Sequence, residues 1–201
     1  MRNYDRYQNY TESKYNKKGI SWLLMKKQAD KKLIPYVKSI QKKKILEVGP
    51  GYGYYTRYLL ENQNEVSGVD INPELGSDIG IEITKGQADQ LQDIVHDKYD
   101  RICSFFMTEY LDEQQMKEFM LQSIALLKPS GIFATTAILN RGLGRIYITL
   151  ARMKGVRKFC YSIKALREML GEERKVRIVL LNTVFHIPFA VLIEVEQQGQ
   201  K

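Results

Sequence analysis

The chain has few of the residues that disulfide frameworks and metal centres require. Among 201 residues there are two cysteines, Cys103 and Cys160, and two histidines. Two cysteines are too few for a disulfide framework or for a zinc site built from thiolates, so no metal is expected. The low cysteine content is typical of a protein in the reducing cytoplasm, which is the compartment we predict.

Long apolar runs are also absent. The longest, near residues 189–195, has the length of a strand and not of a membrane-spanning helix. Residues 1–16 are polar and rich in tyrosine, without the apolar stretch of a signal peptide. We therefore expect one soluble domain with a sizeable core, attached at most to a membrane surface.

Charge is distributed unevenly along the chain. Residues 1–44 hold 13 lysines and arginines against 3 acidic residues, 45–140 hold 6 against 15, and 141–177 hold 11 against 3. Two basic flanks thus enclose an acidic centre, within a net charge of +8. The flanks either form solvated helix faces or present a basic rim to an anionic substrate, an RNA or an acidic lipid surface.

Strand-like and helix-like segments alternate along the chain. The expected strands are 44–48, 65–70, 81–84, 99–105, 132–138, 176–184 and 189–195. The expected helices are 20–40, 54–62, one starting at Asn72-Pro73, 113–127 with a capping box at Asp112, and one from Ser162 to Gly171. Pro35 should bend or end the first helix, and Pro129-Ser130-Gly131 should turn the chain into the fifth strand. This alternation predicts a doubly wound, mostly parallel α/β sheet of seven strands with an antiparallel edge strand.

The most informative segment follows the first expected strand and reads Gly49-Pro50-Gly51-Tyr52-Gly53. Glycines at alternate positions let the backbone pass close to a ligand, and the amides at the next helix start can meet a polar ligand group. Asp70 ends the next strand, where an acidic side chain can bind both ribose hydroxyls. A dinucleotide-binding turn would have glycine at Tyr54, and a nucleoside triphosphatase loop would contain Gly-Lys-Ser/Thr, so neither pattern fits.

With Glu47 before it, the Gly49-x-Gly51-x-Gly53 spacing resembles motif I of the class I S-adenosylmethionine-dependent methyltransferases. The resemblance covers residues 41–196 and implies a Rossmann-like catalytic core that binds S-adenosylmethionine and releases S-adenosylhomocysteine. It places the methionine part of the cofactor along the glycines, the ribose at Asp70 and the adenine on Ile71. The residues that it assigns to the cofactor are Glu47, Gly49, Pro50, Gly51, Gly53, Asp70, Ile71, Gln87, Ala88 and Phe105.

One position departs from the pattern of many members of that family. They have Gly-Asp-Ala after the third strand, and the aspartate accepts a hydrogen bond from the adenine amino group. This chain has Gly86-Gln87-Ala88-Asp89 instead. Either the amide oxygen of Gln87 or, after a small shift in register, the carboxylate of Asp89 can take that role.

Catalytic residues are harder to assign, because methyl transfer from a sulfonium depends mainly on alignment and on exclusion of water. Three candidates are Glu109 after the fourth strand, His186 between the last two strands and Tyr10 near the N-terminus. Each has a plainer interpretation: a surface glutamate, a structural histidine and part of a disordered tail. We interpret residues 1–40 as a helical lid or cap segment and residues 41–201 as the cofactor-binding domain.

A second cap is expected as an insertion at about residues 140–160. Its apolar residues fall on one helical stripe, and its basic residues lie elsewhere: the stripe is Leu143, Ile146, Tyr147, Leu150 and Met153. Such a helix either caps the acceptor pocket, lies on an anionic membrane as a peripheral contact, or packs on its own domain.

The predicted acceptor is a small molecule, and the basic segments would suit an anionic or lipidic one. An RNA methyltransferase and a non-catalytic partner protein that binds S-adenosylmethionine are the alternatives. The segment 104–107 lacks the Asn/Asp-Pro-Pro-aromatic signature of enzymes that methylate base amino groups, which argues against that kind of RNA enzyme. Nothing in the sequence predicts the oligomeric state.

Overall fold

The computed structural model describes residues 25–171, 174–182 and 186–197. In these ranges seven strands form one sheet in the order β3-β2-β1-β4-β5-β7-β6. The strands are β1 (Lys44–Val48), β2 (Glu65–Asp70), β3 (Ile83–Lys85), β4 (Tyr99–Ser104), β5 (Leu127–Ile138), β6 (Val176–Asn182) and β7 (Pro188–Glu196). The pairs from β3 to β5 are parallel, and β7 is antiparallel to both β5 and β6.

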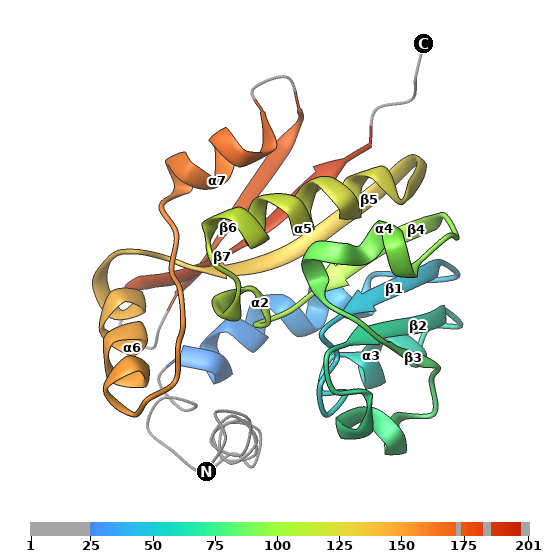
Figure 1. Cartoon of the computed structure of the whole chain (residues 1–201), viewed down its shortest axis with the longest axis horizontal. Coiled ribbons are helices and arrows are strands. Elements are labelled where there is room, and N and C mark those ends of the chain that lie inside the picture. The colour runs from blue at the N-terminus through green and yellow to red at the C-terminus, as the bar shows by residue number, and fades with distance from the viewer. Residues whose placement is uncertain (1–24, 172–173, 183–185, 198–201) are drawn as a thin grey trace.

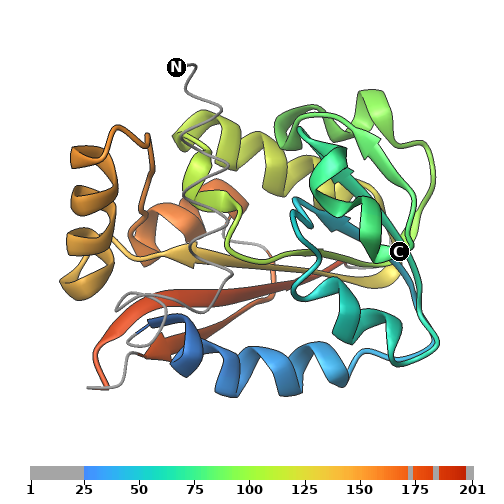
Figure 2. The same ribbon diagram turned by 90° about the horizontal axis from the view of Figure 1, so that it is seen from below.

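Helices cover both faces of this sheet (Figures 1 and 2). They are α2 (Lys27–Lys38), α3 (Thr56–Leu60), α4 (Leu91–Ile94), α5 (Glu113–Ala125), α6 (Gly142–Met153) and α7 (Ile163–Leu170), with short 3-10 helices η2 (Pro73–Ile79), η3 (Ala88–Gln90) and η4 (Thr108–Tyr110). Helices α4, α5 and α7 lie on one face, and α2 and α3 lie on the other (Figure 2). Helix α6 lies at the end of the sheet, directly after β5 (Figure 1).

The sheet separates two apolar layers. Phe119 of α5 belongs to one layer and Leu33 of α2 to the other, and both side chains are fully buried. In β5 the consecutive residues Phe133 and Ala134 contribute to opposite layers, because successive side chains of a strand point to opposite faces. The predicted doubly wound, mostly parallel sheet is therefore confirmed, and its antiparallel pair lies at one edge with β6 outermost.

Local signals at several element ends are also confirmed. The expected bounds 44–48 and 65–70 are those of β1 and β2. Asp112 Oδ1 accepts from the Gln115 amide at 3.0 Å while Gln115 Oε1 accepts from the Asp112 amide at 3.1 Å, which is a capping box. The Ser162 hydroxyl accepts from the Ala165 amide at the start of α7.

Two expectations at prolines differ from the structure. Of the two outcomes expected at Pro35, an end of the helix is wrong, because α2 continues to Lys38. Pro35 is exposed, so the carbonyl that loses its helical donor faces solvent, while buried Leu33 and Val37 hold the helix on the sheet. Residues 129–131 lie within β5, which begins at Leu127, and the change of direction becomes a register shift against β4 with φ of +60° at Ser130.

Three other segments differ from their expected bounds. Residues 73–79 form a 3-10 helix, and the Asn72 side chain makes no cap hydrogen bond. Gly76 allows this tight path, because a Cβ atom there would lie 2.3 Å from Ile83 Cδ1. The helix expected at 54–62 is only Thr56–Leu60, because the glycine turn extends to its start, and the third strand is Ile83–Lys85. None of the helices in the described ranges combines the length and hydropathy of a membrane span.

Candidate active site

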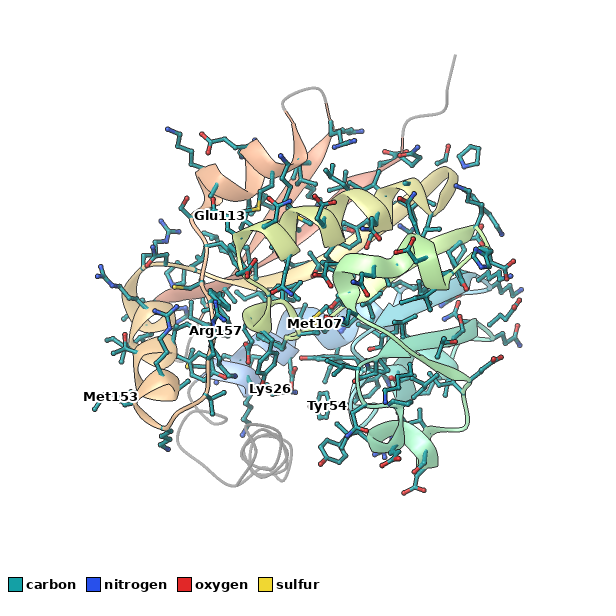
Figure 3. The ribbon with its side chains drawn as sticks, in the orientation of Figure 1. Lys26, Tyr54, Met107, Glu113, Met153 and Arg157 are labelled. Atoms are coloured by element: carbon teal, nitrogen blue, oxygen red, sulfur yellow. The ribbon has the colours of Figure 1, made fainter. Side chains whose placement is uncertain are left out.

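The carboxyl ends of β1, β2 and β4 lie next to one another, since β1 pairs in parallel with both neighbours. The chain order of the sheet reverses between β1 and β4, and ligands of doubly wound sheets bind outside such a switch point. Figure 3 shows that Lys26, just before α2, Tyr54 and Met107 gather at this edge. These side chains come from three segments that are far apart in the sequence.

The glycine turn leaves open space over one of its three glycines. Gly49, Gly51 and Gly53 all have φ between +53° and +74°, a region that favours glycine. A Cβ atom at Gly49 would lie 2.4 Å from Met107 Cγ, and one at Gly53 would lie 2.3 Å from Ile79 Cδ1. At Gly51 a Cβ atom would have no atom of the described residues within 4 Å. Gly49 and Gly53 therefore pack against the protein, whereas Gly51 faces space that a ligand can fill.

Asp70, the last residue of β2, holds the turn in place. Its Oδ2 accepts from the Gly51 amide at 3.0 Å, and its Oδ1 accepts from the Asn72 amide at 2.8 Å. Burial raises the pKa of Asp70, and the hydrogen bonds from backbone amides oppose that rise. The carboxylate is thus fixed in orientation beside the open space at Gly51.

Glu47 is a buried acid behind the same turn. Its side chain lies in β1, and Oε2 accepts from the Thr56 hydroxyl at 2.6 Å. Burial raises the pKa of Glu47 to about 7; the Thr56 hydrogen bond opposes the rise and the charge of Asp70 adds to it. A carboxyl in this state can ionise when a cationic group binds nearby, so it suits an ammonium group of a ligand.

The residues expected around the adenine lie at the ends of β2 and β3. Ile71 directly follows Asp70 and is 58% exposed, which is high for an apolar side chain at a strand end. The Gly86 amide donates to the Asp70 carbonyl at 3.0 Å and joins the two strand ends, and Gln87 and Ala88 follow, exposed and half-buried. An exposed apolar side chain thus lies at the end of β2, which is joined to the residues after β3.

Asp89 differs from Gln87 in its environment. Its Oδ2 accepts from the Gln115 side chain of α5 at 3.1 Å. Its Oδ1 is buried and has no donor among the described residues. The structure therefore holds the Asp89 carboxylate through one oxygen and leaves the other without a donor among the described residues, whereas Gln87 is exposed.

Two other predicted cofactor residues are buried. Phe105, directly after β4, is packed against the Tyr55 ring with centroids 4.9 Å apart. Pro50 is buried under the turn, where a Cβ atom at Gly68 would lie 3.2 Å from Pro50 Cγ. Both side chains therefore belong to the packed interior next to the turn.

An acidic residue that the sequence analysis missed connects α2 to the glycine turn. Asp30 is buried, and it accepts from the Tyr54 hydroxyl at 2.7 Å and from the Tyr55 hydroxyl at 2.6 Å. The Lys26 ammonium lies 3.3 Å from Asp30 Oδ2 and 3.2 Å from the centre of the Tyr54 ring. The partners of Asp30 lie 24 and 25 residues away in the sequence. The only sequence signal for this cluster was the presence of three tyrosines within residues 52–55.

Glu109 is not the surface residue that the sequence favoured. It lies in η4 and is almost fully buried, because the 154–162 segment and α6 cover it. Its Oε1 accepts from the Tyr147 hydroxyl at 3.1 Å and contacts the fully buried ammonium of Lys158, which also donates to the Tyr147 hydroxyl at 2.7 Å. We call Glu109, Tyr147 and Lys158 the buried polar triangle. It joins the end of β4 to the expected cap at about 140–160.

The other catalytic candidates lie elsewhere. His186 is exposed on the connection between β6 and β7, with φ of +58°. Tyr10, together with residues 1–24 of the expected lid, lies outside the described residues. Within the described ranges no three side chains of His, Cys, Asp and Glu gather as a metal site would require.

The arrangement fits one nucleoside ligand with a charged tail. Open backbone at Gly51, the fixed carboxylate of Asp70 and the exposed Ile71 lie in sequence along the strand ends, and Glu47 lies behind them. These groups match, in order, a close polar tail, a ribose diol and a flat apolar base. The residues present therefore fit S-adenosylmethionine.

Comparisons with known proteins identify the family and the fold. The family model described as a methyltransferase domain matches residues 22–174. A SAM-dependent methyltransferase from Archaeoglobus fulgidus has a similar fold, with a TM-score of 0.72, 18% identity, and coverage of 94% of this chain and 99% of that one. No curated protein sequence matches the chain.

Two further solved structures share the fold and contain the reaction product. Magnesium protoporphyrin IX methyltransferase from Synechocystis with bound SAH has a TM-score of 0.68 and 13% identity, and the match covers 97% of this chain and 94% of that one. The N-methyltransferase NodS from Bradyrhizobium japonicum, in complex with S-adenosyl-L-homocysteine, has a TM-score of 0.68, 15% identity, and coverage of 96% and 99%.

Proposed function

Because this chain belongs to the S-adenosylmethionine-dependent methyltransferases, we propose that it methylates a small-molecule acceptor at the carboxyl ends of β1 and β4. The observation that carries the proposal is the open space at Gly51 beside the fixed carboxylate of Asp70. The buried polar triangle, which follows β4, would close the neighbouring side of the site.

We assign cofactor binding to the turn and the two strand ends beside it. The backbone at Gly51 would contact the methionine part, and the carboxyl of Glu47 would balance its ammonium charge. Asp70 would accept from the ribose hydroxyls with lone pairs that its backbone donors leave available, and Ile71 would pack on the adenine. For the adenine amino group we choose Asp89 over Gln87, since Oδ1 of Asp89 has no donor among the described residues.

The protein's own residues do not have to activate the methyl donor. S-adenosylmethionine, when bound, supplies a methyl group on a positively charged sulfur that is already a good leaving group. The protein then has to hold the acceptor in line with that bond and exclude water. Phe105 and Phe106, which follow β4, pack against the Tyr55 ring at the start of α3, and we infer that these three buried rings exclude water from below the turn.

We place the acceptor beside the buried polar triangle. Tyr147 and Lys158 come from the cap and meet Glu109 below it, so the polar groups are buried and not spread over an open surface. We infer that the acceptor binds beside this set, whose hydroxyl, ammonium and carboxylate hold the cap in place by bonding to one another. The similar folds above include an enzyme named for magnesium protoporphyrin IX, which is a small molecule.

A labelled-methyl assay tests this proposal. The chain is incubated with S-adenosylmethionine labelled at the methyl group and with separate pools of small molecules, lipids, RNA and protein from cells. We expect label in the small-molecule or lipid pool, and we expect its transfer to fall in Asp70→Ala but not in Asp93→Ala, an exposed aspartate of α4. Label in RNA alone would overturn the acceptor class, and binding without transfer to any pool would favour a non-catalytic partner protein.

A further inference from the structure

Helix α6 carries large apolar side chains on the side that faces away from the protein. Its buried residues are Gly144, Ile148 and Ala151. Ile146, Leu150 and Met153 are 54%, 53% and 79% exposed. With 3.6 residues per turn these three lie on one line along the opposite side of the helix, which we call the outer stripe.

The orientation of α6 is set by Gly144. A Cβ atom at Gly144 would lie 2.3 Å from the Leu139 carbonyl oxygen and 2.6 Å from that of Phe189. The helix therefore packs by its backbone against the ends of β5 and β7. The outer stripe is left on the surface by this packing, and Met153 projects outward from the body of the protein (Figure 3).

The apolar line continues beyond the helix. Gly142 lies one turn before Ile146 on the same line, and a Cβ atom there would lie 3.3 Å from Ile187 Cγ2. Ile187 is itself 41% exposed, in the connection between β6 and β7. The outer stripe and Ile187 thus form a ridge along a helix that is about 18 Å long. Single exposed apolar residues are ordinary, but a continuous line of four is not.

The sequence segment that contains α6 has basic residues and no acidic ones. Residues 140–167 contain eight lysines and arginines and no acidic residue. Arg141, Arg145 and Arg152 are exposed and fall on one flank of α6, and exposed Lys154 follows its end. An apolar ridge with basic residues beside it is the pattern of helices that lie in the interface of a membrane containing anionic lipid.

We propose that the outer stripe, Ile187 and the flanking arginines dock this protein on the surface of an anionic phospholipid membrane. The apolar ridge would enter the boundary between headgroups and acyl chains, and the arginines would contact lipid phosphates. Two-fold pairing with a second copy is disfavoured, because it would bring the two sets of arginines together. A nucleic acid is disfavoured because the ridge is aliphatic and would face phosphates.

Docking by α6 also has a consequence for the acceptor, and this step rests on the proposed function. Tyr147 lies on the inner side of α6 and donates to Glu109, so the same helix contacts the membrane and closes the acceptor pocket. The acceptor end of the site would then open near the membrane interface. The acceptor class that this geometry favours is an amphiphilic molecule with a polar group to be methylated and an apolar body left in the lipid.

Vesicle flotation with the full chain tests the docking proposal. Vesicles of phosphatidylcholine are compared with vesicles that also contain phosphatidylglycerol, for the wild type and for Ile146→Asn/Leu150→Asn. We expect the wild type to float with the anionic vesicles. In the double variant the floated fraction should fall by at least about tenfold, because two apolar side chains that would enter the membrane are replaced by polar ones. The matched control is Leu60→Asn/Leu180→Asn, which changes two partly exposed leucines on α3 and β6 and should float like the wild type.

A charge variant and a cofactor measurement complete the test. Arg145→Gln/Lys154→Gln should weaken flotation with anionic vesicles, and added salt should do the same to the wild type. Three results would overturn the proposal. They are no flotation of the wild type, equal flotation of Ile146→Asn/Leu150→Asn and of the control double variant, and a dimer that only Ile146→Asn/Leu150→Asn disrupts. Calorimetric binding of S-adenosylhomocysteine is measured on every variant, so failure of docking with intact binding leaves the proposed function in place.

Discussion

The Gly51 amide donates a hydrogen bond to Asp70 Oδ2 across 3.0 Å and thereby joins the glycine turn after β1 to the end of β2. The same carboxylate accepts from the Asn72 amide through its other oxygen. One side chain therefore sets the position of the turn and of the adjoining strand end. Because Gly51 faces open space and Asp70 lies beside it, this contact is the centre of the proposed cofactor site.

The first prediction compares two glycines of the turn. Gly51→Ala and Gly53→Ala both place a side chain at positive φ, which costs about 1–2 kcal/mol in each case. Only at Gly53 does the new Cβ also meet protein, at Ile79. We expect Gly53→Ala to lower the free energy of unfolding more, and Gly51→Ala to lower affinity for S-adenosylhomocysteine more. Urea unfolding and calorimetry on both variants check this, and equal ligand affinity in wild type and Gly51→Ala would show that no ligand occupies that space.

The second prediction concerns pH and cofactor binding. Burial raises the pKa of Glu47 to about 7, so below that pH the carboxyl is largely protonated in the free protein. The ammonium of the cofactor favours the ionised form, so affinity should rise as the pH increases through about 7 and a proton should be released on binding. Calorimetry near pH 7 in two buffers of different ionisation enthalpy measures that proton. In Glu47→Gln the proton release should disappear; its persistence would assign it to another group.

The third prediction follows from the same group without any ligand. The folded pKa of Glu47 lies above the ordinary value of 4.5, so the folded state binds this proton more tightly than the unfolded state does. Its stabilising contribution is present below about pH 4.5 and is lost as the pH rises through about 7. We therefore expect Glu47→Gln to gain stability relative to the wild type between those values. Thermal unfolding of both proteins across the range measures this, and a constant difference would contradict it.

The fourth prediction concerns the buried polar triangle. Lys158→Met removes the ammonium that contacts Glu109 in a fully buried position, and removal of one partner of a buried pair typically costs about 3–5 kcal/mol. Lys164→Met in the exposed Lys164–Glu168 pair of α7 is the matched control and should change stability by less than about 1 kcal/mol. Replacing both partners, as Glu109→Gln/Lys158→Met, should recover part of the loss. Urea unfolding gives all three values, and equal effects of the two lysine variants would contradict a buried pair.

Local patterns predicted much of this fold. The glycine turn, the acid at the end of β2 and the Asp112 cap each depend on residues close in sequence or at a fixed offset. The contacts of Asp30 with Tyr54 and Tyr55, and of Glu109 with Lys158, join segments 24 to 49 residues apart. No periodicity in the sequence encodes such pairs, so they emerge only when the chain is folded.

Helix α6, in the expected cap at about 140–160, shows a second feature that a sequence pattern does not predict. Its predicted apolar stripe does lie on one side of a helix, but Leu143 and Tyr147 are half-buried while Ile146, Leu150 and Met153 are exposed. Amphipathicity fixes which residues share a face and does not fix which face turns inward. In α6 the inward face is the one that contains Gly144, because the absence of a Cβ atom there lets the helix backbone approach the carbonyl groups of Leu139 and Phe189.

Calorimetric titration of S-adenosylhomocysteine into the wild type, Asp70→Asn and Asp93→Asn tests the central claim most directly. Asp70→Asn keeps the size of the side chain but removes the charge that accepts from the ribose, so affinity should fall by about tenfold or more. Asp93→Asn, at an exposed aspartate of α4, should bind like the wild type. Saturable binding that only the first substitution weakens is the predicted result. Absence of binding to the folded wild type, or the same affinity in all three proteins, would contradict a cofactor site at Gly51 and Asp70.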